Sequence, residues 1–247
     1  MKLIAFIRSI LVSFIFIVHT ILWSSLGFIT NLIFNDKPKD DRIIGTWARM
    51  VCWLYNVKVV VQNPEKIPAD GCVLLFNHSS FFDIFALAAA RPEIRFGAKL
   101  ELFSIPFFGP AMRRAGTLPI TRNNREETLR VYAQAKGRFA TGQKFALSPE
   151  GGRFHGENLF PFKAGPFLFA MSSEVDLCPV IIHNAYEALP KGSIFANSDR
   201  WTRTIVLEVL PPISTKGFHV EQRQELVAKA YQVMNQAWLS PQFKEKP

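Results

Sequence analysis

The strongest constraint on this chain is an apolar run near its start. Residues 9–34 contain no Asp, Glu, Lys or Arg over 26 consecutive positions. As a helix they would extend about 39 Å, against about 30 Å for the hydrocarbon core of a bilayer. His19, Ser24, Ser25 and Gly27 interrupt the run, so a tilted span and a half-immersed helix are both open. A cleaved signal peptide is disfavoured, because the run is long and no A-x-A-like site follows it.

A second helix is expected after a charged break at residues 35–41. Between residues 43 and 55 the apolar side chains follow helical rather than alternating spacing. Its tryptophans and arginines, Trp47, Trp53, Arg42 and Arg49, are typical of a helix that lies in a membrane interface. A second helix that packs on a protein core is the alternative. Residues 1–56 are therefore expected to form a two-helix membrane anchor, whose orientation the flanking basic residues do not fix.

Composition narrows the class of partner. Hydrophobic residues make up 49% of the chain and include 23 phenylalanines, which suits a protein that meets lipid. The formal net charge of +9 favours an anionic partner, whether nucleic acid, an anionic membrane surface or a phosphorylated substrate. Nucleic acid is disfavoured, because the sequence has no basic helix and no ladder of alternating aromatic and basic residues. A membrane surface and a phosphorylated substrate are the partners we expect.

The three cysteines, Cys52, Cys72 and Cys178, stand singly in apolar contexts. Their spacing matches neither a zinc site nor a redox pair, so they are interpreted as reduced, buried thiols of a cytosol-facing domain. The sequence also lacks a glycine-rich dinucleotide fingerprint and a Walker-type phosphate loop. These observations disfavour nicotinamide-dependent enzymes, P-loop enzymes and zinc proteins.

Short β-rich runs alternate with helical ones after residue 56. The alternation predicts one α/β domain over residues 57–247, with a mixed, largely parallel sheet flanked by helices. The expected strands are residues 57–61, 73–76, 94–98, 117–120, 145–147, 177–182 and 205–210, and the expected helices are residues 83–90, 107–114, 126–140, 164–172 and 220–239.

His78 and Asp83 follow the apolar strand at residues 73–76, with four residues between them. A carboxylate beside an imidazole fixes its tautomer and stabilises the imidazolium, so the pair could act as a general base on a hydroxyl. The carboxyl edge of an open α/β sheet is where such folds place their ligands. The alternative is a helix start, with Ser80 as the N-cap and Asp83 in the first turn.

Further charged and glycine residues follow the other predicted strands. Cations at strand ends can hold a phosphate, and arginine does so with two parallel hydrogen bonds. Glycine allows the backbone to approach a ligand closely. The candidates for substrate binding are Lys99, Gly116, Arg122, Gly151, Gly152 and Arg153, and Glu150 joins His78 and Asp83 as a candidate catalytic residue.

In order along the chain, these residues resemble the four motifs of the glycerolipid acyltransferase family, and most those of the lysophosphatidic acid acyltransferases. The family's N-H-x-S-x-x-D begins at Asn77, its G-x-x-x-I-x-R begins at Gly116, and its apolar segment around a proline lies at residues 177–182. The third motif, usually F-P-E-G-T-R, reads Ser-Pro-Glu-Gly-Gly-Arg from Ser148. Ser148 and Gly152 depart from it, and the second departure puts the acceptor headgroup in question.

The resemblance implies a membrane-bound enzyme of phospholipid biosynthesis on the cytoplasmic face of the cell (inner) membrane. It would move an acyl group from acyl-CoA or acyl carrier protein to the sn-2 hydroxyl of lysophosphatidic acid, with no metal and no further cofactor. His78 would take the hydroxyl proton, Asp83 would orient it, and Arg122 and Arg153, with Lys99, would hold the phosphate. Two alternatives stay open: an acyltransferase for another lyso-lipid acceptor, and a non-catalytic lipid-binding module.

Overall fold

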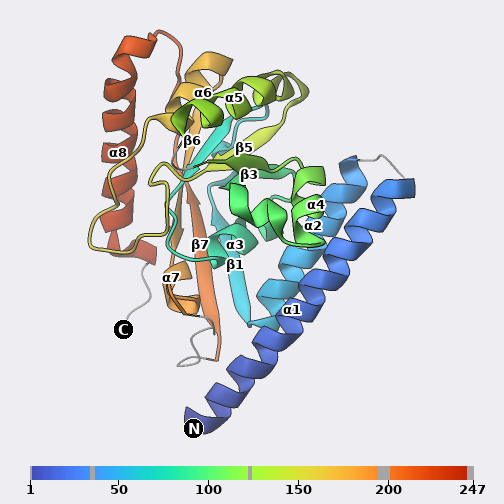
Figure 1. Cartoon of the computed structure of the whole chain (residues 1–247). Helices are drawn as coiled ribbons and strands as arrows, with labels where there is room; N and C mark the ends of the chain where they lie inside the picture. The colour runs from blue at the N-terminus through green and yellow to red at the C-terminus, as the bar shows by residue number, and fades with distance from the viewer. Residues whose placement is uncertain (1, 34–36, 122–123, 194–200, 244–247) are drawn as a thin grey trace.

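The computed structural model of the chain describes residues 2–33, 37–121, 124–193 and 201–243. Within this part, one sheet has the strand order β1-β7-β6-β2-β5-β3-β4. Every neighbouring pair is parallel except β6 and β7, which are antiparallel. The prediction of a mixed, largely parallel sheet is therefore confirmed (Figure 1). The strands are β1 Val57–Gln62, β2 Val73–Phe76, β3 Ile94–Lys99, β4 Leu118–Ile120, β5 Lys144–Leu147, β6 Leu177–His183 and β7 Arg203–Val209.

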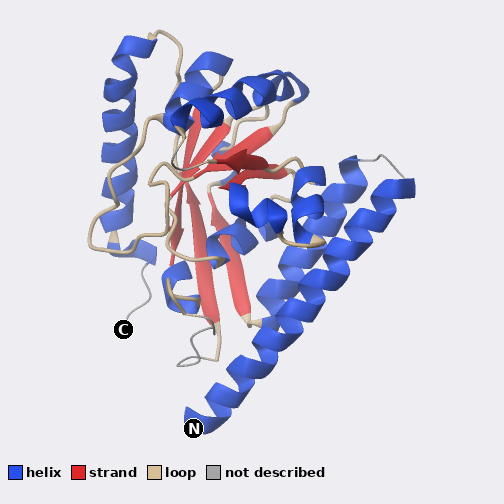
Figure 2. Cartoon of the chain, in the orientation of Figure 1, coloured by secondary structure: helices blue, strands red, loops and turns tan. Residues whose placement is uncertain are grey.

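The helices lie on both faces of this sheet (Figure 2). The α-helices are α1 Lys2–Ile33, α2 Lys37–Leu54, α3 Phe82–Ala90, α4 Phe108–Arg114, α5 Arg125–Ala135, α6 Gly165–Ser173, α7 Ala185–Ala188 and α8 Arg223–Leu239. Short 3-10 helices are η1 Pro64–Lys66, η2 Leu100–Ser104, η3 Lys136–Thr141, η4 Val220–Gln222 and η5 Pro241–Phe243. The helix expected over residues 126–140 is thus divided into α5 and η3. Gly137 lies at the start of η3, and glycine is a poor helix former.

Strand alternation builds two cores from one sheet, because successive side chains point to opposite faces. Val73 and Leu75 of β2 face α5, α6 and α8. Leu74 and Phe76 of the same strand face α2, α3 and α7. All four side chains are at most 3% exposed, so β2 is buried on both faces in the centre of the sheet, as a parallel strand of this kind usually is.

Helix α1 lies along the side of the domain, outside α2 and beside α4 (Figure 1). Polar side chains of this helix face the protein and apolar ones face outward, the reverse of a helix on a water-soluble domain. Ser9, Ser13 and Ser24 are buried at 7–8% exposure, whereas Phe14 and Leu22 are 64% and 63% exposed. Residues Ile7–Gly27 form a stretch long and apolar enough to cross a membrane by length and composition.

Helix α2 packs between α1 and α3. Ala48 and Val51 are fully buried, and the Trp47 ring meets the Phe85 ring edge-on with 5.4 Å between centroids. One face of α2 therefore belongs to the core, as the alternative interpretation of this segment has it. Trp53 on its other side is 78% exposed. A role for that outer face in the membrane interface stays a prediction.

The carboxyl ends of β2, β3, β4, β5 and β6 share one edge of the sheet, because these strands run parallel. Strands β1 and β7 run the opposite way. The residues after β2 and β5 are therefore neighbours at this edge, although about 70 positions separate them in the sequence.

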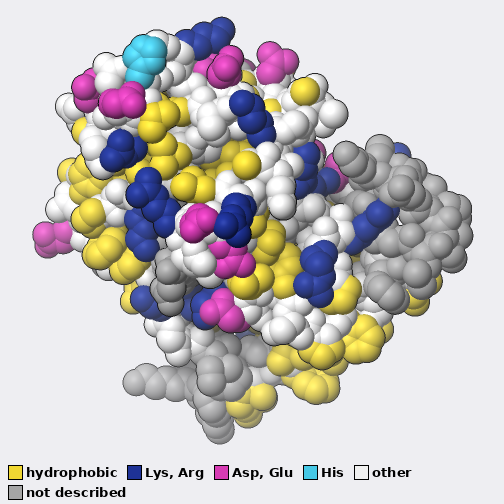
Figure 3. All heavy atoms as spheres, turned by 45° about the horizontal axis from the view of Figure 1, so that its top comes forward, with side chains coloured by type: hydrophobic (Ala, Val, Ile, Leu, Met, Phe, Trp, Pro, Cys, Tyr) yellow, Lys and Arg dark blue, Asp and Glu magenta, His cyan; other side chains and the backbone are white. Residues whose placement is uncertain are grey.

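On the side that lies at the top of Figure 1 and is turned forward in Figure 3, lysine and arginine side chains are interspersed with hydrophobic ones.

Candidate active site

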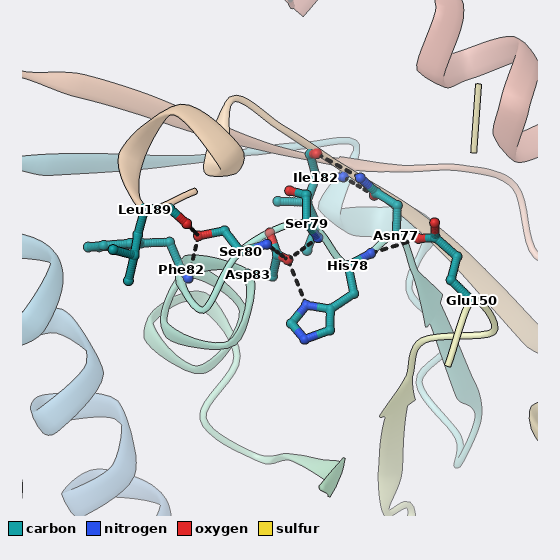
Figure 4. Close-up of polar contacts among 9 residues, drawn as sticks. All are labelled: Asn77, His78, Ser79, Ser80, Phe82, Asp83, Glu150, Ile182 and Leu189. Atoms are coloured by element: carbon teal, nitrogen blue, oxygen red, sulfur yellow. Dashed lines mark hydrogen bonds and ion pairs between the residues drawn. The ribbon is translucent and has the colours of Figure 1, made fainter. Parts of the chain in front are cut away.

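His78 and Asp83 form an ion-pair-like contact at the end of β2 (Figure 4). His78 Nδ1 lies 2.8 Å from Asp83 Oδ2, and the carboxylate is fully buried. The same oxygen accepts the backbone N–H groups of Ser79 and Ser80 at 2.8 Å each. An ionised carboxylate only accepts hydrogen bonds, so Nδ1 is the donor in this contact, and in the neutral imidazole Nε2 then carries the lone pair. Figure 4 shows this second ring nitrogen pointing away from Asp83.

The same residues lie at the start of α3, where Phe81 rather than the expected Ser80 is the N-cap. Ser80 Oγ accepts the Phe82 N–H at 3.1 Å and donates to the Leu189 carbonyl at 2.9 Å. The Asp83 carboxylate stands in the first turn, where the helix dipole favours a negative charge. The turn that begins the helix therefore also fixes the acid that orients His78.

Asn77 ties this turn to the neighbouring strand. Its side-chain amide donates to the Ile182 carbonyl at 3.0 Å and its amide oxygen accepts the Ile182 N–H at 2.7 Å. Because the side chain is 2% exposed, both bonds lie away from water, where an unpaired amide would be costly. Sequence reasoning gave Asn77 no role beyond its place in the motif; in the structure it sets where the chain leaves β2.

Glu150 lies in the turn after β5 and holds backbone rather than a side chain. Its Oε1 accepts the His78 N–H at 2.9 Å and its Oε2 accepts the Phe160 N–H at 3.1 Å. The residue is 2% exposed. Burial raises its pKa to about 7, although these two hydrogen bonds act in the opposite direction. Glu150 therefore fixes the backbone of the candidate base and titrates near neutral pH.

Arg153 reaches the same place from the loop after β5. Its guanidinium carbon lies 4.0 Å from the centre of the Phe81 ring, and Phe81 stands between His78 and Asp83 in the sequence. The next residue of the loop, Phe154, donates its N–H to the His78 carbonyl at 2.7 Å. The structure thus places Glu150 on the backbone of His78 and Arg153 on the ring of Phe81, three residues after His78. Phe81 was not among the predicted site residues.

The two glycines before Arg153 are explained by their neighbours. Gly151 has φ +71°, and a Cβ there would lie 2.8 Å from Lys163 Nζ. At Gly152 a Cβ would lie 2.9 Å from Cε2 of Phe154. The Phe154 ring is stacked on Phe160 with 3.9 Å between centroids. The departure from the family's threonine at position 152 therefore has a steric cause, namely the ring of Phe154.

Lys99 and Gly116 stand further along the sheet edge. Lys99 ends β3, which is separated from β2 by β5 and so by about 10 Å. Its Nζ lies 3.1 Å from Glu101 Oε1, and both side chains are exposed. Gly116 has φ +74°, its carbonyl accepts Arg138 Nη1 at 3.0 Å, and a Cβ there would collide with the guanidinium. The left-handed backbone conformation accounts for this glycine.

Arg122 lies outside the described residues. Strand β4 ends two residues earlier at Ile120, which pairs with Lys99 of β3. The chain therefore leaves β4 at the same sheet edge as the other site segments. The part that Arg122 plays at this edge stays a prediction.

The cysteines are free and buried, as predicted. Burial raises the pKa of Cys52, Cys72 and Cys178 to about 12 each. Thiols of this kind are poor nucleophiles at neutral pH. Among the residues that the structure describes, no three His, Cys, Asp or Glu side chains are grouped so that they could hold a metal ion.

Comparison with known proteins agrees with this geometry. The chain is 27% identical over 224 residues to 1-acyl-sn-glycerol-3-phosphate acyltransferase of Escherichia coli, with 89% of each chain covered. It is 26% identical over 244 residues to the Pseudomonas aeruginosa protein of the same name, covering 97% of this chain and 91% of that one. A human relative, 1-acyl-sn-glycerol-3-phosphate acyltransferase beta, is 28% identical over 201 residues, covering 80% and 70%.

The fold is also that of a solved structure. The crystal structure of the 1-acyl-sn-glycerophosphate (LPA) acyltransferase from Thermotoga maritima superposes with a TM-score of 0.80 at 22% identity, covering 98% of this chain and all of the other. The model of the family described as "Acyltransferase" matches residues 58–183, just over half of the chain. That stretch contains the described site residues from His78 to Arg153, and this chain belongs to the acyltransferase family.

Proposed function

We propose that the protein transfers a fatty acyl group from a thioester donor, acyl-CoA or acyl carrier protein, to the sn-2 hydroxyl of 1-acylglycerol 3-phosphate. The product would be phosphatidic acid. The names of the bacterial and human relatives support this acceptor. The single observation that carries the proposal is the contact of His78 Nδ1 with the buried Asp83 carboxylate, which leaves Nε2 as a base.

The reaction needs one base and one orienting acid. His78 Nε2 removes the proton of the acceptor hydroxyl as its oxygen attacks the thioester carbonyl. The carbon–sulfur bond breaks, and the imidazolium returns the proton to the departing thiolate. Asp83 stabilises the imidazolium between these steps. Two backbone N–H groups also bind Asp83 Oδ2 and hold the carboxylate in place beside His78.

Arg153 is proposed to hold the acceptor phosphate. Its guanidinium is placed on the Phe81 ring, two residues from Asp83 along the chain. A phosphate bound there would place the rest of the acceptor near His78. Such positioning raises the effective concentration of the hydroxyl without any contact to the reacting bond. Arg122 and Lys99 would extend the positive edge along the sheet.

The acceptor is a membrane lipid, and the N-terminal region fits that source. Apolar side chains such as Phe14 and Leu22 face outward on α1 while its serines face the protein. Because α1 lies lengthwise on the domain, we favour a helix half-immersed in one leaflet over a helix that spans the bilayer. The net charge of +9 suits an anionic leaflet and an anionic donor. On this proposal the domain lies on the cytoplasmic face of the inner membrane.

Thiol release from acyl-CoA and from acyl carrier protein tests the proposal, with detergent-purified protein and 1-acylglycerol 3-phosphate as acceptor. We expect release that depends on the acceptor and is lost in His78→Ala. The comparison of acyl-CoA with acyl carrier protein shows which of the two the protein uses as donor. Release with a phosphate-free lyso-lipid but not with 1-acylglycerol 3-phosphate would overturn this choice of acceptor. It would favour an acyltransferase for another lyso-lipid.

A further inference from the structure

The loop between β5 and α6, residues 151–164, has no regular secondary structure. It nevertheless contacts both segments of the candidate site, the one after β2 and the one after β5. The Phe154 N–H binds the His78 carbonyl at 2.7 Å, and the Phe160 N–H binds Glu150 Oε2 at 3.1 Å. Buried backbone groups need hydrogen-bond partners, and without a strand or helix the loop cannot supply them itself. The partners of the residues between Phe154 and Phe160 must therefore come from elsewhere in the protein.

The stretch between them is held by side chains from α8. Asn235 Oδ1 accepts the Leu159 N–H at 2.8 Å, and the Tyr231 hydroxyl donates to the Leu159 carbonyl at 3.0 Å. Asn235 Nδ2 also donates to Asn158 Oδ1 at 3.0 Å. Both backbone groups of Leu159 are therefore bound by a helix that lies more than 70 positions later in the sequence.

Trp238 adds a third attachment one turn further on. Its indole Nε1 lies 3.2 Å from the Gly156 carbonyl oxygen and 3.1 Å from that of Glu157, so the N–H is shared between them. The ring itself stacks on His183 of β6, with 6.2 Å between centroids and 12° between planes. Trp238 is 8% exposed, so it connects the loop to the buried end of a central strand.

Tyr231, Asn235 and Trp238 are spaced at i, i+4 and i+7, which places them on one face of α8. We propose that this row acts as a set of positioning residues for acyl transfer, holding the 151–164 loop so that Phe160 and Phe154 fix Glu150 and His78. The expected effects on acyl transfer rest on the proposed function. The expectation that these three residues hold the 151–164 loop does not.

The polar side chains of this row contact a different part of the protein from the apolar side chains of the same helix. The apolar residues of α8, Leu226, Ala230 and Met234, already bury that helix in the core. The Tyr231, Asn235 and Trp238 bonds all end on the loop instead. Leu159 directly precedes Phe160, so release of Leu159 would free the donor on Glu150 Oε2. Loss of that donor would raise the Glu150 pKa further, and Asp83 is a nearby charge that also raises it.

Asn235→Ala is the variant that tests the row, with Gln236→Ala as its matched control. Gln236 is the next residue of α8 and is exposed. Asn235→Asp is the conservative variant, because its carboxylate still accepts the Leu159 N–H and the Asn158 amide can turn to donate to it. Thermal unfolding of all three shows whether each folds.

Two measurements decide the outcome. For Asn235→Ala we expect faster amide hydrogen exchange at residues 156–162, about a tenfold loss in kcat/KM, and an acid limb of the pH profile moved to higher pH. Asn235→Asp should restore the pH profile and most of the activity, and Gln236→Ala should match the wild type. Unchanged exchange at residues 156–162 in Asn235→Ala would overturn the proposal whether or not the protein transfers acyl groups. Faster exchange with an unchanged pH profile, in a wild type that turns over, would also overturn it.

Discussion

The two segments that build the candidate site are held in opposite ways. At the end of β2, the contacts of Asp83 with His78, Ser79 and Ser80 join residues three to five positions apart. After β5, Glu150 binds a residue 72 positions away, and the loop that follows is bound by α8 across 72 to 82 positions. The contacts that orient the His78 ring thus lie within the first segment, whereas the conformation of the second segment depends on residues elsewhere in the fold.

The largest effect should come from the first segment. We expect His78→Ala to lower kcat by about 10³-fold, since general bases commonly contribute 10²–10⁴. Vesicle binding should be unchanged, because the apolar outward face of α1 is untouched. Thiol release and vesicle flotation measure the two properties on one preparation. Activity kept within a few-fold of the wild type would remove the general-base role.

Glu150 tests the second segment through stability. Its ordinary pKa of 4.5 is raised to about 7 in the folded protein, so between these values the native state binds more protons than the unfolded state. The protonated form is then favoured by folding, and this contribution is lost as pH rises from 4.5 through 7. The total is about 3 kcal/mol.

Urea unfolding of the wild type and of Glu150→Gln from pH 4.5 to 8 measures this contribution. The difference in unfolding free energy between the two proteins should fall by about 3 kcal/mol across that range, because glutamine does not titrate. Parallel curves for the two proteins would mean that folding leaves the Glu150 pKa at its ordinary value of 4.5, and that its two backbone hydrogen bonds offset its burial.

Arg153 belongs to the second segment but contacts the first. Arg153→Ala should raise the KM for 1-acylglycerol 3-phosphate about tenfold with little change in kcat, because a phosphate contact binds ground and transition states alike. Phe81→Leu, which removes the ring under the guanidinium, should raise the KM in the same direction and less. An unchanged KM in Arg153→Ala would mean that Arg153 does not bind the phosphate and only packs on Phe81.

The same contrast explains what the sequence could predict. The His78–Asp83 pair could be predicted from its spacing, because the groups that bind Asp83 Oδ2 lie three to five positions away in the chain. The central strands were readable too, since runs such as Val73–Phe76 are buried on both faces. The Phe160 N–H on Glu150 and the α8 row were not, because their spacing reflects how α8 packs on the sheet. The antiparallel direction of β7 is a matter of its pairing with β6, which no local pattern in β7 encodes, and the four residues of α7 are too few for a helical pattern.

Gly152 offers the smallest and most local test of the second segment. A Cβ at this position would lie 2.9 Å from Phe154 Cε2. The stacking of this ring on Phe160, with 3.9 Å between centroids, limits how far it can move. Gly152→Ala should therefore cost about 1 kcal/mol in unfolding free energy, as overpacking does.

Phe154→Leu removes the edge of the ring that causes the clash, so Gly152→Ala should cost much less in that background. The double-mutant cycle, measured by urea unfolding, should give a coupling of about 1 kcal/mol between the two positions. Additive effects would show that the ring moves freely and that Phe154 does not explain the glycine. A coupled pair would mean that the Phe154 ring is what excludes a larger side chain at position 152, next to the arginine whose guanidinium lies over Phe81.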